Sequence, residues 1–111
     1  MPSPFQPVSK DPEAARKLLA SLWERSLPTL QERLTLLDDA VVAARAGALT
    51  LQLRQNAMET AHKLAGSLGM FGYPEGTDFA RRIEQQLDAT TPVNALQLAQ
   101  DVAAMRASLS L

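Results

Sequence analysis

The sequence predicts an all-α fold, an antiparallel up-down-up-down four-helix bundle with an additional N-terminal helix. Apolar residues recur at spacings of three and four along most of the chain, which is the period of an amphipathic helix. No segment alternates apolar and polar residues in the period-2 pattern of a strand. The links between the periodic segments are short, so we expect consecutive helices to run antiparallel.

The chain is expected to begin with a flexible proline-rich arm over residues 1–10, followed by one helical domain over residues 11–111. Asp11 has the position of an N-cap, with proline at the first helical position and glutamate favourable to the helix dipole. This first helix is predicted to end near Arg25. We expect it to bury four side chains: Leu18, Leu19, Leu22 and Trp23.

Ser26 and Pro28 predict either a break or a kink, because proline disfavours a helical conformation in the residue before it. The second helix has the clearest pattern, and Gly47 is expected to end it in the left-handed conformation. Its apolar seam consists of Leu27, Leu30, Leu34, Leu37, Val41 and Ala44. The third helix is predicted from about Leu49 to Phe71.

A turn is predicted over residues 72–76, and Thr77 or Asp78 is expected to cap a fourth helix. Thr91 and Pro92 are expected to start the last helix. The apolar positions of these two helices are Phe79, Ile83 and Leu87 in the first, and Ala95, Leu98, Val102, Met105 and Leu109 in the second.

Composition restricts the possible functions. The 111 residues suffice for one domain, and 46% apolar with 21% charged residues is typical of a globular protein. A net charge of −1 gives no reason to expect binding to nucleic acid or to an anionic membrane. The absence of cysteine excludes disulfides, thiolate catalysis and cysteine zinc sites. Without a signal-peptide pattern or a long apolar run, we expect a cytoplasmic protein, and a monomer because no feature demands dimerisation.

The single histidine, His62, lies on the polar side of the third predicted helix. It points roughly 140° away from the middle of the apolar stripe and should be exposed. Its neighbours on that face are Met58, Glu59, Ala65, Gly66 and Gly69, and the last three of these are very small. An exposed imidazole on a face with little bulk indicates a residue that a large partner approaches.

The segment from His62 to Gly72 resembles the signature of histidine-containing phosphotransfer domains. The matching elements are the histidine, a leucine two residues later, glycine and serine four and five later, and a glycine ten later. The helix with Phe79-Ala80-Arg81-Arg82-Ile83-Glu84 also resembles the next helix of the family, and the resemblance covers roughly residues 12–109. It implies a phosphoryl carrier without an ATP site, which is not itself an enzyme. The implied partners are response-regulator receiver domains, a histidine kinase, or both.

Under this resemblance His62 is the phosphoacceptor, and no cofactor or metal is expected on this chain, since Mg²⁺ would belong to the receiver. Many members have a lysine three residues after the histidine, where this chain has Ala65. Two alternatives remain open: Lys63 supplies the cationic contact, or the phosphoryl group depends on solvent and the partner. Gly66 would leave room for the phosphoryl group. The predicted docking surface consists of Leu51, Gln55, Met58, Glu59, Ala65 and Gly69.

Other interpretations were weighed. The same bundle could be a docking or inhibitory module that binds receivers or kinases without phosphorylation. An enzyme is disfavoured, because the sequence has no nucleotide-binding motif and no further histidines for a metal site. Arg81 and Arg82 are most simply a solvated helix face, and Ser67 is expected to hydrogen-bond to backbone or between helices.

Overall fold

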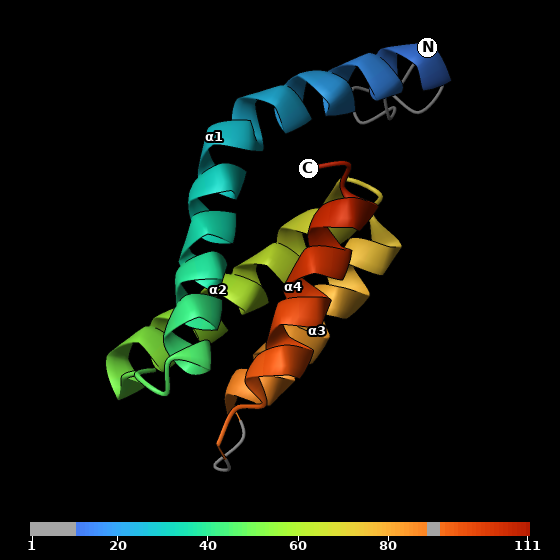
Figure 1. Cartoon of the computed structure of the whole chain (residues 1–111). Helices are drawn as coiled ribbons and strands as arrows, with labels where there is room; N and C mark the ends of the chain where they lie inside the picture. The colour runs from blue at the N-terminus through green and yellow to red at the C-terminus, as the bar shows by residue number, and fades with distance from the viewer. Residues whose placement is uncertain (1–10, 89–91) are drawn as a thin grey trace.

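The computed structural model describes residues 11–88 and 92–111, which form four α-helices (Figure 1). These are α1 (Pro12–Arg45), α2 (Leu51–Met70), α3 (Pro74–Asp88) and α4 (Ala95–Ser108). Helix α1 packs against α2 and α4, while α3 packs against the same two helices from the other side. The predicted all-α bundle is confirmed. The arm expected over residues 1–10 and the expected helix start at Thr91 lie outside the described residues.

The prediction of a separate N-terminal helix is wrong, because α1 is continuous and Pro28 lies inside it. Figure 1 shows the helix bending sharply where its colour changes from blue to teal. Pro28 has no N–H to donate to the carbonyl of Glu24, and the Ser26 hydroxyl donates to the Leu22 carbonyl at 2.8 Å. Both features bend helices without ending them. Of the two outcomes expected at this position, the structure has the kink.

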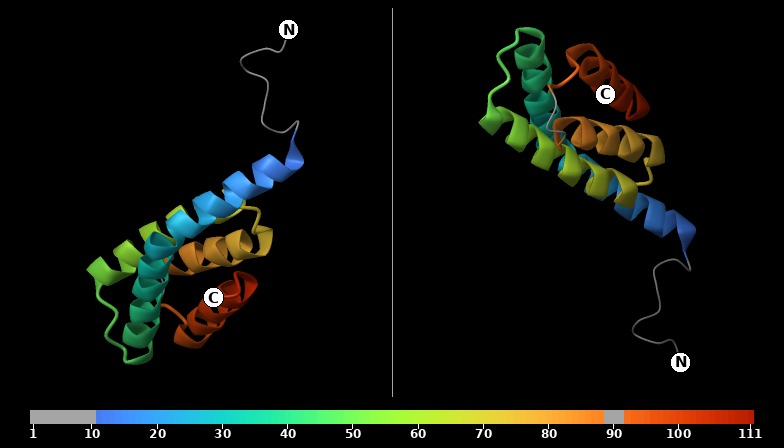
Figure 2. Two further views of the ribbon diagram at one scale, coloured as in Figure 1. Left: turned by 90° about the horizontal axis from the view of Figure 1, so that it is seen from above. Right: turned by 90° about the horizontal axis from the view of Figure 1, so that it is seen from below.

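The expected burial of the first leucines is also wrong. Leu18, Leu19 and Leu22 are 53%, 43% and 37% exposed, because the part of α1 before the kink extends past the other helices (Figure 2). Trp23 is half-buried, and its ring centroid lies 5.3 Å from that of Phe71 and 4.7 Å from that of Tyr73. This aromatic cluster attaches α1 to the turn between α2 and α3.

The hydrophobic core lies between all four helices, and its burial supplies the main stabilising contribution. Its largest fully buried side chains are Leu34, Leu37, Leu64, Leu68, Ile83, Leu98 and Met105. An ion pair between Arg106 and Asp38 connects α4 to α1. The part of the chain described here contains no helix that is long and apolar enough to span a membrane.

Some of the helix caps and starts predicted from the sequence are confirmed, and others are wrong. The Asp11 carboxylate accepts from the backbone N–H groups of Glu13 and Ala14, both at 3.2 Å, and Gly47 follows α1 with φ of +64°. The predicted start of α3 at Thr77 or Asp78 is wrong, because Pro74 occupies the first helical position, which it suits. The last helix begins later than predicted, at Ala95. Its N-cap is Asn94, which accepts from the backbone N–H of Gln97 at 3.1 Å.

Candidate functional site

His62 lies on α2 with its side chain 78% exposed, as the helical periodicity predicted. The opposite face of α2 is buried through Ala57, Ala61 and Leu64, which orients the whole helix. The Thr50 hydroxyl caps its N-terminus by accepting from the backbone N–H of Leu53 at 3.1 Å. The imidazole is therefore carried by a rigid, well-anchored element and points to solvent.

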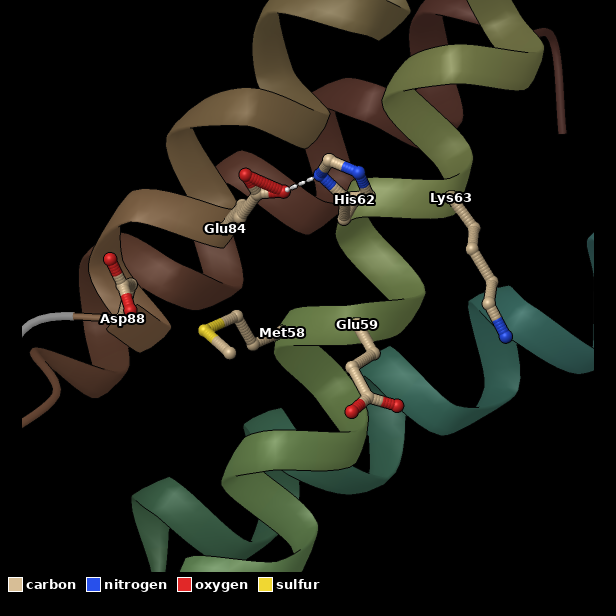
Figure 3. Close-up of a pocket in the computed structure, with 6 residues that line it drawn as sticks. All are labelled: Met58, Glu59, His62, Lys63, Glu84 and Asp88. Atoms are coloured by element: carbon tan, nitrogen blue, oxygen red, sulfur yellow. Dashed lines mark hydrogen bonds and ion pairs between the residues drawn. The ribbon is translucent and has the colours of Figure 1, made fainter.

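The ring has one partner on α3. His62 Nδ1 lies 2.8 Å from Oε2 of Glu84, which is itself partly exposed (Figure 3). An ionised carboxylate can only accept a hydrogen bond, so Nδ1 carries the proton and donates it. The neutral ring then has its lone pair on Nε2, which points away from the carboxylate. Glu84 thus selects the tautomer in which the free nitrogen is a nucleophile.

Sequence reasoning did not identify this role of Glu84. Glu84 belongs to the segment that resembles the family, and this resemblance is the signal that could have identified it. Its contact with His62 depends, however, on how α3 is placed against α2, and the periodicity of either helix alone does not give that register.

Two hollows lie on either side of the imidazole. The first, of about 380 Å³, is lined by Met58, Glu59, His62, Lys63, Glu84 and Asp88. Figure 3 shows the Lys63 side chain pointing away from the ring. The second, of about 320 Å³, is lined by His62, Ala65, Gly66, Arg81, Glu84 and Gln85. A Cβ added at Gly66 would meet no atom within 4 Å, so this glycine leaves open space beside the imidazole.

The structure corrects the placement of Ala65 in the expected docking surface. Ala65 is only 9% exposed and forms part of the core. The reason is the close approach of α3: the Thr77 hydroxyl donates to the Ala65 carbonyl at 3.3 Å. Gly69 is exposed, yet a Cβ there would lie 3.6 Å from Thr77 Oγ1, so it borders the same contact between helices.

The remaining predicted docking residues lie on the histidine face of α2. Leu51 is 73% exposed and Gln55 is also exposed. At a rise of about 1.5 Å per residue they lie about 16 Å and 10 Å along the helix before His62. Met58 is half-buried against the core, and Glu59 is exposed beside it. The face therefore presents polar Gln55 and Glu59 together with two apolar side chains, the half-buried Met58 near the imidazole and the exposed Leu51 farther along the helix.

Ser67, as expected, makes hydrogen bonds to the backbone and between helices. Its hydroxyl donates to the Lys63 carbonyl at 3.0 Å and accepts from Arg33 Nη1 of α1 at 3.4 Å. Within residues 11–88 and 92–111, no group of three or more histidine, cysteine, aspartate or glutamate side chains could hold a metal ion.

The single histidine of this sequence is thus exposed on the helical bundle, with its ring held from a neighbouring helix. The chain matches the model of the Hpt domain over residues 21–108, and it belongs to that family. It is 35% identical to Protein RcaC of Microchaete diplosiphon over 69 residues, which are 62% of this chain and 11% of RcaC. No solved structure matches it. Domains of this family are phosphotransfer modules of two-component phosphorelays that interact with receiver domains and histidine kinases, and the chain spans about a tenth of the length of the relative it matches.

Proposed function

We propose that this protein is a phosphorelay intermediate that accepts a phosphoryl group on Nε2 of His62 and exchanges it with the aspartate of a receiver domain. The observation that carries the proposal is the exposed imidazole, 78% accessible, whose Nδ1 is hydrogen-bonded to Glu84 at 2.8 Å. This arrangement leaves Nε2 as the one ring nitrogen free to react.

The transfer step follows from this tautomer. The Nε2 lone pair attacks the phosphorus of the receiver's aspartyl phosphate, and an N–P bond forms as the acyl O–P bond breaks. The aspartate leaves as a carboxylate on the receiver, which also supplies Mg²⁺ and its own lysine. This protein contributes a positioned nucleophile, and in-line positioning accounts for much of the barrier reduction in such reactions.

Glu84 has a second effect after transfer. With Nδ1 still protonated, the phosphorylated ring is a cation, and the adjacent carboxylate stabilises that charge. The reverse step, in which a receiver aspartate attacks the phosphorus, then releases a neutral imidazole with the proton still on Nδ1. Glu84 thus favours one tautomer throughout both directions of transfer.

The docking surface we propose surrounds His62 on α2 and consists of Leu51, Gln55, Met58, Glu59, Gly66 and Gly69. Met58 and Leu51 supply apolar contacts and Gln55 and Glu59 polar ones, a mixture that is usual in transient interfaces. Gly66 lets the partner approach the ring closely, because no atom occupies the space next to it.

The test is phosphoryl transfer from radiolabelled, phosphorylated receiver domains to the wild-type protein and to His62→Gln, with the exposed α4 variant Gln100→Ala as control. We expect an acid-labile, base-stable label on wild type and Gln100→Ala only. Because His62 is exposed, His62→Gln should change the free energy of unfolding by less than about 0.5 kcal/mol. A receiver that binds both the wild-type protein and His62→Gln tightly, with no transfer to either, would instead indicate a docking or inhibitory module.

A further inference from the structure

We propose that Arg81 of α3 is the cation that contacts the phosphoryl group on His62. This inference rests on the proposed function and adds to it a phosphate-binding residue that comes from the helix opposite the phosphoacceptor. Residue 65 is an alanine and cannot supply such a contact. Lys63 does not supply it in this structure, because its side chain points away from the ring (Figure 3).

The geometry places Arg81 at a hollow that also borders the imidazole. Arg81 and His62 line the same hollow of about 320 Å³, and Gly66 contributes no side chain to fill it. Arg81 precedes Glu84 by three residues, so the two side chains lie on one face of α3. The helix face that brings Glu84 to Nδ1 therefore also brings Arg81 to the side of the ring.

Arg81 is also available for binding. It is exposed, and within the described residues it makes no hydrogen bond or ion pair. Its neighbour Arg82 differs, because the Arg82 guanidinium lies 5.3 Å from the centroid of the Phe79 ring. The two adjacent arginines are therefore a matched pair, of which only Arg81 borders the histidine.

Charge decides which side of the ring the phosphoryl group occupies. The group carries close to two negative charges, and the hollow lined by Met58 and Lys63 also has Glu59 and Asp88 on its walls. Those carboxylates repel it. The hollow on the Gly66 side is lined by Arg81 instead of Glu59 and Asp88, while Glu84 lines both hollows. A guanidinium can donate two parallel hydrogen bonds to phosphoryl oxygens, so the phosphoryl group is held on the Gly66 side.

The experiment uses phosphoramidate, a small phosphodonor that needs no receiver. Nε2 attacks its phosphorus, the P–N bond of the donor breaks, and ammonia leaves. We would follow the rate of phosphohistidine formation and its ³¹P NMR shift in wild type, Arg81→Ala, Arg81→Lys and Arg82→Ala, after checking each fold by circular dichroism. Arg81→Ala should slow phosphorylation about fivefold and move the ³¹P resonance, whereas Arg81→Lys should retain most of the rate. Arg82→Ala should match wild type.

Equal rates and equal ³¹P shifts for Arg81→Ala and Arg82→Ala would overturn the inference, whether both match wild type or both are slowed. The failure of the proposed function would look different. In that case phosphoramidate still labels His62 and the effect of Arg81 is still measurable, while no phosphorylated receiver transfers its label to wild type.

Discussion

Substitution of Gly66 by glutamine should raise stability and lower the rate of phosphoryl transfer. Gly66 lies inside α2, where glycine costs about 1 kcal/mol relative to alanine, and a Cβ added there meets nothing within 4 Å. Gly66→Ala and Gly66→Gln should therefore both stabilise the fold. With an unfolding entropy of about 2.1 cal/mol/K per residue over 111 residues, a gain of 0.5–1 kcal/mol raises Tm by about 2 to 4 °C.

The two variants should differ in phosphoryl transfer. The glutamine side chain of Gly66→Gln reaches over the hollow beside His62 and obstructs the receiver, so we expect transfer at least about tenfold slower, whereas the methyl group of Gly66→Ala has little effect. Thermal unfolding and transfer from a phosphorylated receiver measure the two quantities, and Gly66→Ala controls for the change in stability. Wild-type transfer by Gly66→Gln would show that the receiver does not cover this face. A lower Tm in both variants would show that the position is packed rather than open.

Four further substitutions test the fold and the site. Leu34→Ala should lower the free energy of unfolding by about 2 to 5 kcal/mol, because the Leu34 side chain is fully buried. Leu18→Ala should lower it by less than about 1 kcal/mol, because Leu18 is 53% exposed. Equal losses of stability in chemical denaturation would contradict this placement of the two leucines. Gly76→Ala should destabilise the fold although alanine has the better helix propensity, because side-chain atoms from α2 and the end of α4 lie 3.1 to 3.3 Å from a Cβ at this position. A raised Tm would mean that these neighbouring side chains relax. Glu84→Gln should leave Tm nearly unchanged but slow phosphoryl transfer, because an amide oxygen still accepts from Nδ1 but carries no charge; an unchanged transfer rate would remove the carboxylate from the mechanism.

The features predicted correctly are those that depend on one helix alone. The exposure of His62 and the burial of Ala61 and Leu64 follow from the 3.6-residue period of α2. The cap at Asp11 and the left-handed conformation of Gly47 follow from local hydrogen bonding and backbone sterics. None of these requires knowledge of where another helix lies.

Apart from the start of α3, which Pro74 sets locally, the errors discussed here concern positions where the packing of other helices decides the outcome. Leu18 and Leu22 have the spacing of core residues, but the part of α1 that carries them extends beyond the helices that would cover it. A proline inside a helix costs about 3 kcal/mol, but packing of the helix on both sides of the proline can offset that cost. The conformational preference around Pro28 therefore does not by itself predict whether the helix kinks or ends there. Ala65 was placed at the surface because its angular position lies near the histidine, whereas α3 covers it.

The packing of α3 against α2 links the burial of Ala65 to the position of Glu84. The Thr77 hydroxyl bonds to the Ala65 carbonyl at 3.3 Å, and this close approach of α3 is also what allows Glu84 to reach Nδ1 of His62 at 2.8 Å. Position 65 therefore supplies no cation, and under the inference above the positive charge that this protein itself contributes comes from Arg81, one turn before Glu84 on α3.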